Sequence, residues 1–244
     1  MGTLADARDA LAAQSAALLA WAGPLTPRDL DAPSALEGWT VRQLIAHLAV
    51  SNGRIAELPD RATAEEPIPL HVYVRQYRPS AAEILHQPDE IEGDPRPALA
   101  ERTAAALAAI DRGLPGVVMA QRGPLRDVDA ILTRVIELIT HAVDLGAPTE
   151  RAPLELVVRT FAQMLVDLAP GRSVELRVPP FTAVQIIEGQ THRRGTPPAT
   201  VEIAPIDWVR LATGRAQWVD AVEDGTVRAS GQRSDLSPYL PLLS

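Results

Sequence analysis

The segment from Asp127 to Gly146 constrains the fold of this chain more than any other stretch. Read as a helix, it is apolar on nearly all sides, so it is expected inside a core. Arg134, Glu137, His141 and Asp144 interrupt it at successive spacings of three, four and three residues, which places all four on one helical face. Carboxylates are seldom fully buried without compensation. The pattern therefore predicts a cation, a hydrogen-bond network or a metal ion beside this face.

Two interpretations of this polar face remain open from the helix alone. Glu137 and His141, at positions i and i+4, can direct a carboxylate oxygen and an imidazole nitrogen at one metal ion. A solvated or salt-bridged face that includes Arg134 explains the same pattern without a metal, and the isolated helix favours this simpler account. A catalytic zinc site needs three protein ligands and an open position. The metal hypothesis therefore depends on a third ligand.

The best candidate for a third ligand is His47. Thr40 and Gln43 have the spacing of a capping box, which predicts a helix that starts there and ends before Pro59. His47 lies at the edge of the apolar face of this helix, one turn before Ser51. By itself it is best explained as an ordinary boundary histidine. A position across a bundle interior from Glu137 and His141 would make it the third donor.

The first part of the chain is predicted to form a four-helix bundle. Helices are expected over residues 3–22, 40–58, 97–114 and 127–146, with one long connection between the second and the third. That connection, residues 60–96, is rich in proline and acidic residues, and a short helix is expected at Ser80–His86. Long connections are often binding loops. Either a pocket lining or a solvated loop explains its histidines and arginines, which are His71, Arg75, Arg78 and His86.

After Pro148 the pattern changes from helical to mixed. A helix is expected over residues 153–169, and apolar residues then alternate with polar ones, which predicts strands near 174–178, 184–187, 201–203 and 226–230. A short helix is expected at 205–213. The sequence thus predicts an α+β protein of two domains, a helical domain at residues 1–149 and a small α+β domain at residues 150–244.

Composition excludes several classes of function. The formal net charge of −8 argues against a nucleic-acid partner, because phosphate binding needs a clustered cationic surface. The absence of cysteine excludes a thiolate nucleophile from this chain, and the absence of lysine excludes a lysine Schiff base. No long apolar run or basic leader is present, so we expect no membrane association and a soluble, cytoplasmic protein. Nothing in the sequence indicates an oligomeric state.

The motifs of both halves resemble one known family. Gly38-Trp39-Thr40-Val41-Arg42, followed by His47, and the later Glu137-x-x-x-His141-x-x-Asp144 are similar to the mycothiol-dependent maleylpyruvate isomerase family, a branch of the DinB-like metal-binding four-helix bundles. The C-terminal half resembles that family's small, sterol-carrier-like domain, most clearly at residues 208–215. The resemblance covers essentially the whole chain in matching order.

The resemblance implies a site and two small-molecule partners. It implies a divalent metal, usually zinc, held by His47, Glu137 and His141, with solvent or a thiol in the open position. It gives Asp144 a part in the active site, either in orienting His141 or in receiving polar groups of the thiol. It also implies an arginine from the C-terminal domain that meets substrate carboxylates, for which Arg215 is the candidate.

The expected activity is that of an enzyme that borrows a thiol. Mycothiol or a related low-molecular-weight thiol would add to the activated double bond of a small anionic substrate, for isomerisation or for S-transfer. Two alternatives stay open: metal-assisted hydrolysis without a thiol, and a non-catalytic protein that binds a small ligand. The fold alone does not choose the reaction or the substrate.

Overall fold

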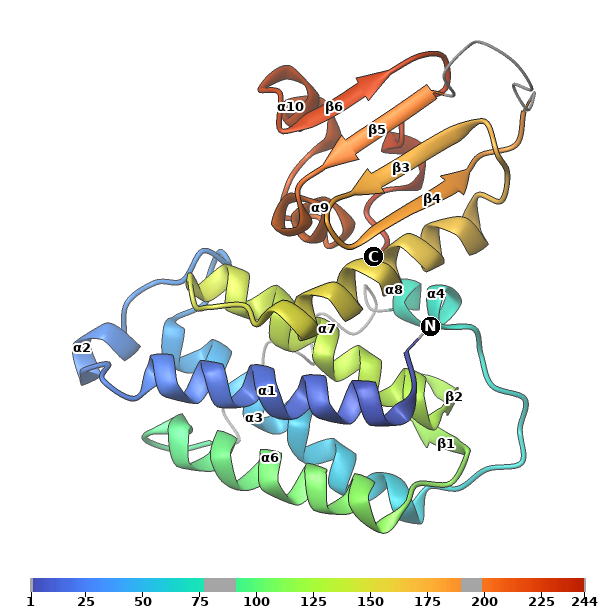
Figure 1. Cartoon of the computed structure of the whole chain (residues 1–244). Coiled ribbons are helices and arrows are strands. Elements are labelled where there is room, and N and C mark those ends of the chain that lie inside the picture. Colours follow the sequence, from blue (N-terminus) through green and yellow to red (C-terminus); the bar gives the residue numbers. More distant parts are fainter. Residues whose placement is uncertain (1, 77–90, 190–198, 244) are drawn as a thin grey trace. The chain divides into compact units, whose positions relative to one another are not determined.

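The structure, a computed structural model, describes residues 2–76, 91–189 and 199–243 and divides into two compact units (Figure 1). The N-terminal unit is mainly helical, and the C-terminal unit combines helices with a sheet. The predicted fold class is therefore confirmed. The division falls between Leu154 and Glu155, while the expected domain boundary at 149/150 stays a prediction. Two short helices of the long connection, α4 (Leu70–Tyr73) and η2 (Val74–Gln76), group with the C-terminal unit.

Four helices form the bundle of the N-terminal unit: α1 (Leu4–Ala22), α3 (Val41–Gly53), α6 (Pro95–Arg112) and α7 (Asp127–Leu145). Both α1 and α3 pack against α6 and α7, so the bundle is closed on all sides (Figure 1). Its core consists of fully buried aliphatic side chains, among them Leu11, Leu18, Leu44, Leu48, Leu99, Ile131 and Leu138. The predicted bundle is confirmed, and its helix positions differ from the expected ones by a few residues.

Helix α3 starts where the capping-box sequence predicts. Thr40 Oγ1 accepts a hydrogen bond from the backbone N–H of Gln43 at 3.2 Å, and Gln43 Oε1 accepts one from the N–H of Thr40 at 2.9 Å. These two bonds satisfy amides that the first turn leaves without helical partners. The helix continues as a 3₁₀ helix, η1 (Arg54–Asp60), which contains Pro59. The cap thereby fixes the phase of the helix that carries His47.

A buried polar cluster ties α3 to two neighbouring helices. Asn52 is fully buried, and its amide nitrogen donates to Thr103 Oγ1 of α6 at 3.0 Å and to Ser15 Oγ of α1 at 3.3 Å. Buried polar groups require such partners, and their directional bonds fix how neighbouring helices align. Asn52 directly follows Ser51 in the chain. Its hydrogen bonds therefore fix the rotation of α3 about its own axis close to the candidate site.

Helix α7 has a defined start and end. At the start, Arg126 Nε lies 2.7 Å from a carboxylate oxygen of the buried Asp129. At the end, Gly146 adopts a left-handed conformation with φ 64°, which side chains other than glycine rarely adopt. The chain therefore leaves the bundle at the residue that the sequence predicted.

A β-hairpin precedes α7, and the sequence analysis did not predict it. Strands β1 (Val117–Ala120) and β2 (Gly123–Arg126) pair antiparallel, and the N–H of Met119 also donates to the carbonyl of Arg61 at 2.7 Å. The connection after α3 thus lies beside the hairpin. Four-residue strands with a proline in β2 are too short to give a clear alternating pattern. Another element that was not predicted is the single-turn helix α2 (Pro27–Leu30).

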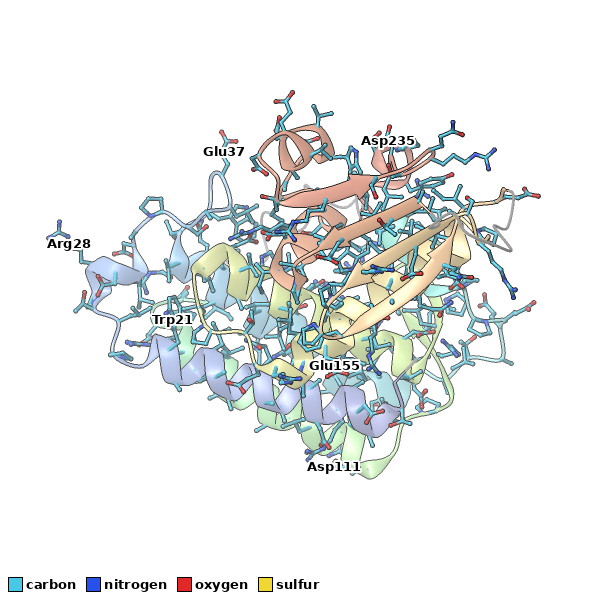
Figure 2. All side chains as sticks on the ribbon, turned by 45° about the horizontal axis from the view of Figure 1, so that its top comes forward. Trp21, Arg28, Glu37, Asp111, Glu155 and Asp235 are labelled. Carbon is cyan, nitrogen blue, oxygen red and sulfur yellow. The ribbon has the colours of Figure 1, made fainter. Side chains whose placement is uncertain are left out.

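Ion pairs on the outer surface join α1 to α6. Arg8 donates from Nε and Nη2 to the two carboxylate oxygens of Asp111 at 2.9 and 3.0 Å. The side chain of Asp111 points outward from the bundle in Figure 2, as do Arg28 and Glu37 near α2. At the other end of α6, Arg96 donates to three carbonyls at the end of α1, which are those of Ala22, Gly23 and Leu25. These contacts satisfy helix-end carbonyls that lack intrahelical partners.

The C-terminal unit is built on a four-stranded sheet. Helix α8 (Arg151–Leu168) leads into β3 (Val174–Val178) and β4 (Thr182–Ile186), and β5 (Ala199–Ile203) and β6 (Val227–Ser230) follow. The strand order is β4-β3-β5-β6, with β3 and β5 parallel and the other pairs antiparallel (Figure 1). The predicted strands are thus present, and their ends differ from the expected ones by a few residues.

Alternate residues of the sheet face a core that is covered by helices. Val174, Leu176 and Val178 are buried along β3, while Arg177 between them is exposed. Trp208 of α9 (Pro205–Ala212) is fully buried, and its indole N–H donates to the carbonyl of Val158 in α8 at 3.4 Å. Two further short helices of this unit, α10 (Trp218–Glu223) and η5 (Ser237–Tyr239), were not predicted.

Two remaining expectations concern the long connection and the membrane. The helix expected at Ser80–His86 lies outside the described residues, as do Arg78 and His86. Within the described ranges, no helix has the length and apolar character that a membrane crossing requires.

The capping box gives a first testable prediction. Replacing Thr40 by Ala removes the acceptor for the N–H of Gln43, so we expect the free energy of unfolding of the N-terminal unit to fall by about 1 kcal/mol. Urea denaturation followed by circular dichroism measures this change. Thr40→Ser keeps the hydroxyl and should lose much less. Equal stability of the Ala and Ser variants would show that the cap contributes nothing.

Candidate functional site

The candidate site lies inside the helical bundle, between α3 and α7. His47 comes from α3, and Glu137 and His141 come from α7. His47 Nε2 is 3.7 Å from Glu137 Oε2, and the ring centroids of His47 and His141 are 5.2 Å apart with their planes at 90°. His47 therefore lies across the bundle interior from the polar face of α7, as a third ligand would have to, and its role as a ligand stays a prediction.

His47 is buried beside an aromatic ring. The imidazole is only 4% exposed, and Trp39, itself 8% exposed, meets it edge to face with ring centroids 5.7 Å apart. Trp39 directly precedes Thr40, the N-cap residue of α3, and its contact with His47 restricts how the imidazole can turn.

The carboxylate of Glu137 is held by two hydrogen-bond donors. Arg134 Nη2 is 3.1 Å from Glu137 Oε1, and the hydroxyl of Ser51 donates to Glu137 Oε2. Burial by itself would raise the pKa of Glu137. The charges of Arg134 and His47 and the hydrogen bond from Ser51 outweigh that effect, so the pKa of this carboxyl is lowered from its ordinary value. Glu137 is therefore an ionised carboxylate at neutral pH.

His141 is oriented by Asp144, one turn further along α7. Its Nδ1 is 2.9 Å from Asp144 Oδ2, and both side chains are nearly buried. An ionised carboxylate can only accept a hydrogen bond, which places the imidazole hydrogen on Nδ1. The lone pair is then on Nε2. Metal-binding histidines commonly have this arrangement, in which a carboxylate fixes the tautomer and the ring orientation.

The residues fit a metal in their chemistry, although their side chains do not form a preassembled cage. Among the described residues, no group of three or more His, Asp or Glu side chains is already close enough to hold an ion. Two ligands of a tetrahedral zinc lie about 3.3 Å apart, and the 3.7 Å between His47 and Glu137 is slightly longer. The donor set of two imidazoles and one carboxylate suits zinc.

The simpler account of the polar face explains part of the arrangement. Arg134 does pair with Glu137, as a salt-bridged face requires. A salt-bridged face does not explain why the buried His47 lies close to Glu137. Nor does it explain why Asp144 holds the ring of the buried His141. A salt bridge alone needs neither imidazole. The two histidines are therefore the features that call for another ligand.

Other candidate residues lie in the C-terminal unit. Arg215 follows α9, is exposed, and donates from its guanidinium to the carbonyl of Thr213 at 3.0 Å. His71 of α4 has its Nδ1 3.8 Å from a carboxylate oxygen of Asp167 in α8. The roles of Arg215 and His71 stay predictions.

The contact of Ser51 with Glu137 was not predicted from the sequence. The signal was present, because Ser51 follows His47 by four residues and so lies on the same face of α3. Serine is common on helices, however, and nothing in the sequence indicates that its hydroxyl meets Glu137, which is far away in the chain.

Comparison with known proteins identifies both halves of the chain. Residues 11–146 match the family model of the mycothiol maleylpyruvate isomerase N-terminal domain, which is more than half of the chain. The chain belongs to this family. Residues 150–242 match a model described as a bacterial SCP ortholog, in agreement with the predicted sterol-carrier-like domain. No protein with a curated description matches the chain at a significant level.

Two solved structures are similar to this chain in fold. A crystal structure of mycothiol-dependent maleylpyruvate isomerase is 20% identical, covers 96% of this chain and 95% of its own, and has a TM-score of 0.59. A crystal structure of a histidine-to-alanine mutant of mycothiol-dependent maleylpyruvate isomerase is 18% identical and has a TM-score of 0.60. The match covers 94% of this chain and 93% of the mutant's chain. At these identities the likeness shows the fold. Membership of the family makes the chain a thiol-dependent, isomerase-like enzyme.

The contact between His141 and Asp144 leads to a second prediction. Asp144→Leu leaves a buried imidazole N–H without an acceptor, which costs about 1–3 kcal/mol. We expect the metal-free protein to lose that much stability in denaturant unfolding. Asp144→Asn is the matched control, because its amide oxygen still accepts from Nδ1 and the loss should be smaller. If both variants were as stable as the unmodified protein, Asp144 would not hold His141.

Proposed function

We propose that this protein is a metal-dependent enzyme that uses mycothiol or a related low-molecular-weight thiol. Its substrate would be a small anion with an activated double bond, and the reaction would be isomerisation or S-transfer. The metal, for which zinc is the best candidate, would be held by His47, Glu137 and His141. The observation that carries the proposal is the meeting of two buried imidazoles and an ionised carboxylate between α3 and α7.

The protein's own residues supply the binding geometry. Asp144 holds His141 with Nε2 as its free donor, and Trp39 restricts the ring of His47. Burial of the site excludes bulk water and strengthens electrostatic interactions there. When bound, a zinc ion with two neutral ligands and one carboxylate keeps a positive charge and lowers the pKa of a thiol in its open position. Because the chain lacks cysteine, that thiol comes from a small molecule.

Substrate recognition is assigned to a cation of the C-terminal unit. Arg215 is exposed, and its guanidinium matches the planar, two-oxygen geometry of a carboxylate. Binding a carboxylate conjugated to the double bond would also favour the negative charge that moves there as sulfur adds. After rotation about the resulting single bond, expulsion of the same thiolate restores the double bond, so no oxidant or reductant is consumed.

Metal binding is the third prediction and the first test of the proposal. Protein purified without a metal-affinity tag should contain close to one equivalent of zinc by elemental analysis, and His47→Ala should lose most of it. Glu137→Gln keeps the shape but loses the charge, so its zinc content should also fall. Arg126→Met, which removes an arginine that pairs with a different carboxylate of α7, is the control and should retain the metal. Full zinc content in His47→Ala would remove that residue from the ligand set.

The fourth prediction concerns Arg215 and the substrate. Arg215→Ala should raise the KM for a cis-configured, doubly anionic substrate about tenfold or more, since a charged hydrogen-bond pair is lost. Zinc content should not change. Isomerisation is followed by ultraviolet absorbance with and without the thiol. An unchanged KM would remove Arg215 from the site, and isomerisation that proceeds equally well without the thiol would contradict the proposed use of a thiol.

A further inference from the structure

The polar network around Glu137 contains a cation of the protein's own. Arg134 is mostly buried, with 12% of its side chain exposed, and two of its contacts belong to the network around Glu137. Its Nη2 lies 3.1 Å from Glu137 Oε1, and its Nη1 donates to Ser51 Oγ at 2.5 Å. The planar guanidinium suits such a double contact, because its nitrogens point in fixed directions.

The direction of every hydrogen bond in this network follows from the groups involved. A guanidinium has donors only, so the oxygen of Ser51 must accept from Arg134. The single hydroxyl hydrogen of Ser51 is then directed at Glu137 Oε2. Arg134 thus acts on one carboxylate oxygen directly and on the other through Ser51. The carboxylate cannot rotate without breaking one of these bonds.

The oxygen that Ser51 contacts is also the one nearest His47. Glu137 Oε2 is 3.7 Å from His47 Nε2, whereas Oε1 is engaged by Arg134. The network therefore turns Oε2 of the carboxylate toward His47, while Oε1 is held by Arg134. A carboxylate held in this way offers a single oxygen to an ion at the site.

We propose that Arg134 is a positioning residue and built-in counter-ion for Glu137, which keeps the helical bundle folded when the site holds no metal and leaves Glu137 as a one-oxygen ligand when it does. This inference rests on the proposed metal site. Glu137 is mostly buried, and removing an arginine that pairs with a buried carboxylate is strongly destabilising. With Arg134 present, the charge of Glu137 is compensated before any metal arrives.

The consequence is a specific dependence of stability on metal. In the unmodified protein, chelation should lower the thermal midpoint only modestly. In Arg134→Met the uncompensated carboxylate destabilises the metal-free protein, while a bound ion takes over the role of counter-ion. Because a ligand stabilises the folded state according to its affinity, the zinc-induced rise in the thermal midpoint should be larger in Arg134→Met than in the unmodified protein, by about 5 °C or more.

The experiment compares thermal unfolding of the full-length protein after chelation and after addition of one equivalent of zinc alone. Arg134→Lys keeps the charge and should behave nearly like the unmodified protein. Arg126→Met is the matched control, because Arg126 also pairs with a buried carboxylate three residues further along the chain, Asp129. Arg126→Met should lower the thermal midpoint of the chelated protein and that of the zinc-loaded protein equally, so the zinc-induced rise should be unchanged.

A double variant tests whether Arg134 acts through Glu137. Arg134→Met combined with Glu137→Gln removes the cation and the charge together, so the metal-free protein should regain most of the stability that Arg134→Met loses. If Arg134→Met can be isolated only with zinc, its unfolding on chelation is the expected effect at its largest, and the double variant remains measurable without metal.

The outcomes separate this inference from the proposed function. Equal zinc-induced rises in Arg134→Met and Arg126→Met, or a double variant no more stable than Arg134→Met, would overturn the role of Arg134 while leaving the metal site intact. Failure of zinc to bind to the unmodified protein would overturn the proposed metal site itself, and the inference with it.

Discussion

The structure depends on one electrostatic constraint, a carboxylate enclosed in a helical bundle. Glu137 is mostly buried on the side of α7 that meets α3, and an ionised carboxylate is stable there only with cationic and hydrogen-bonding partners. Arg134, Ser51 and His47 meet this requirement from two helices. The bundle therefore has to hold α3 and α7 in one relative rotation, and the capping box at Thr40 and the buried amide of Asn52 both help to set it.

Two polar pairs of α7, each at a spacing of three residues, differ in their consequences. Arg134 and Glu137 neutralise each other, which keeps a carboxylate inside the bundle. Asp144 accepts from His141, which fixes a tautomer and leaves one nitrogen lone pair available. The first pair makes the site stable, and the second prepares it for a ligand. A structural salt bridge accounts for the first pair alone, so the second gives the stronger indication of chemistry.

Much of this could be worked out from the residues alone. The periodicity of α7 and the interruptions at Glu137 and His141 predicted the buried polar face, and the capping box predicted where α3 begins. The change to an alternating pattern after Pro148 predicted the second, sheet-containing part. These features are local, because helix phase and strand alternation depend on neighbours within a few residues. The hairpin of β1 and β2 escaped prediction, since its strands are short and contain a proline.

Only the folded bundle decided which side chains meet. Ser51 and Glu137 are 86 residues apart in the chain, and their hydrogen bond depends on the rotation of α3 against α7. The contact of His47 with His141 also depends on that rotation. Arg134 contacts Glu137 of its own helix and Ser51 of α3, so its position too requires both helices. The sequence thus predicted which types of side chain the candidate site contains. It did not predict their partners, because partners are fixed by packing between helices, and packing is a property of the whole core.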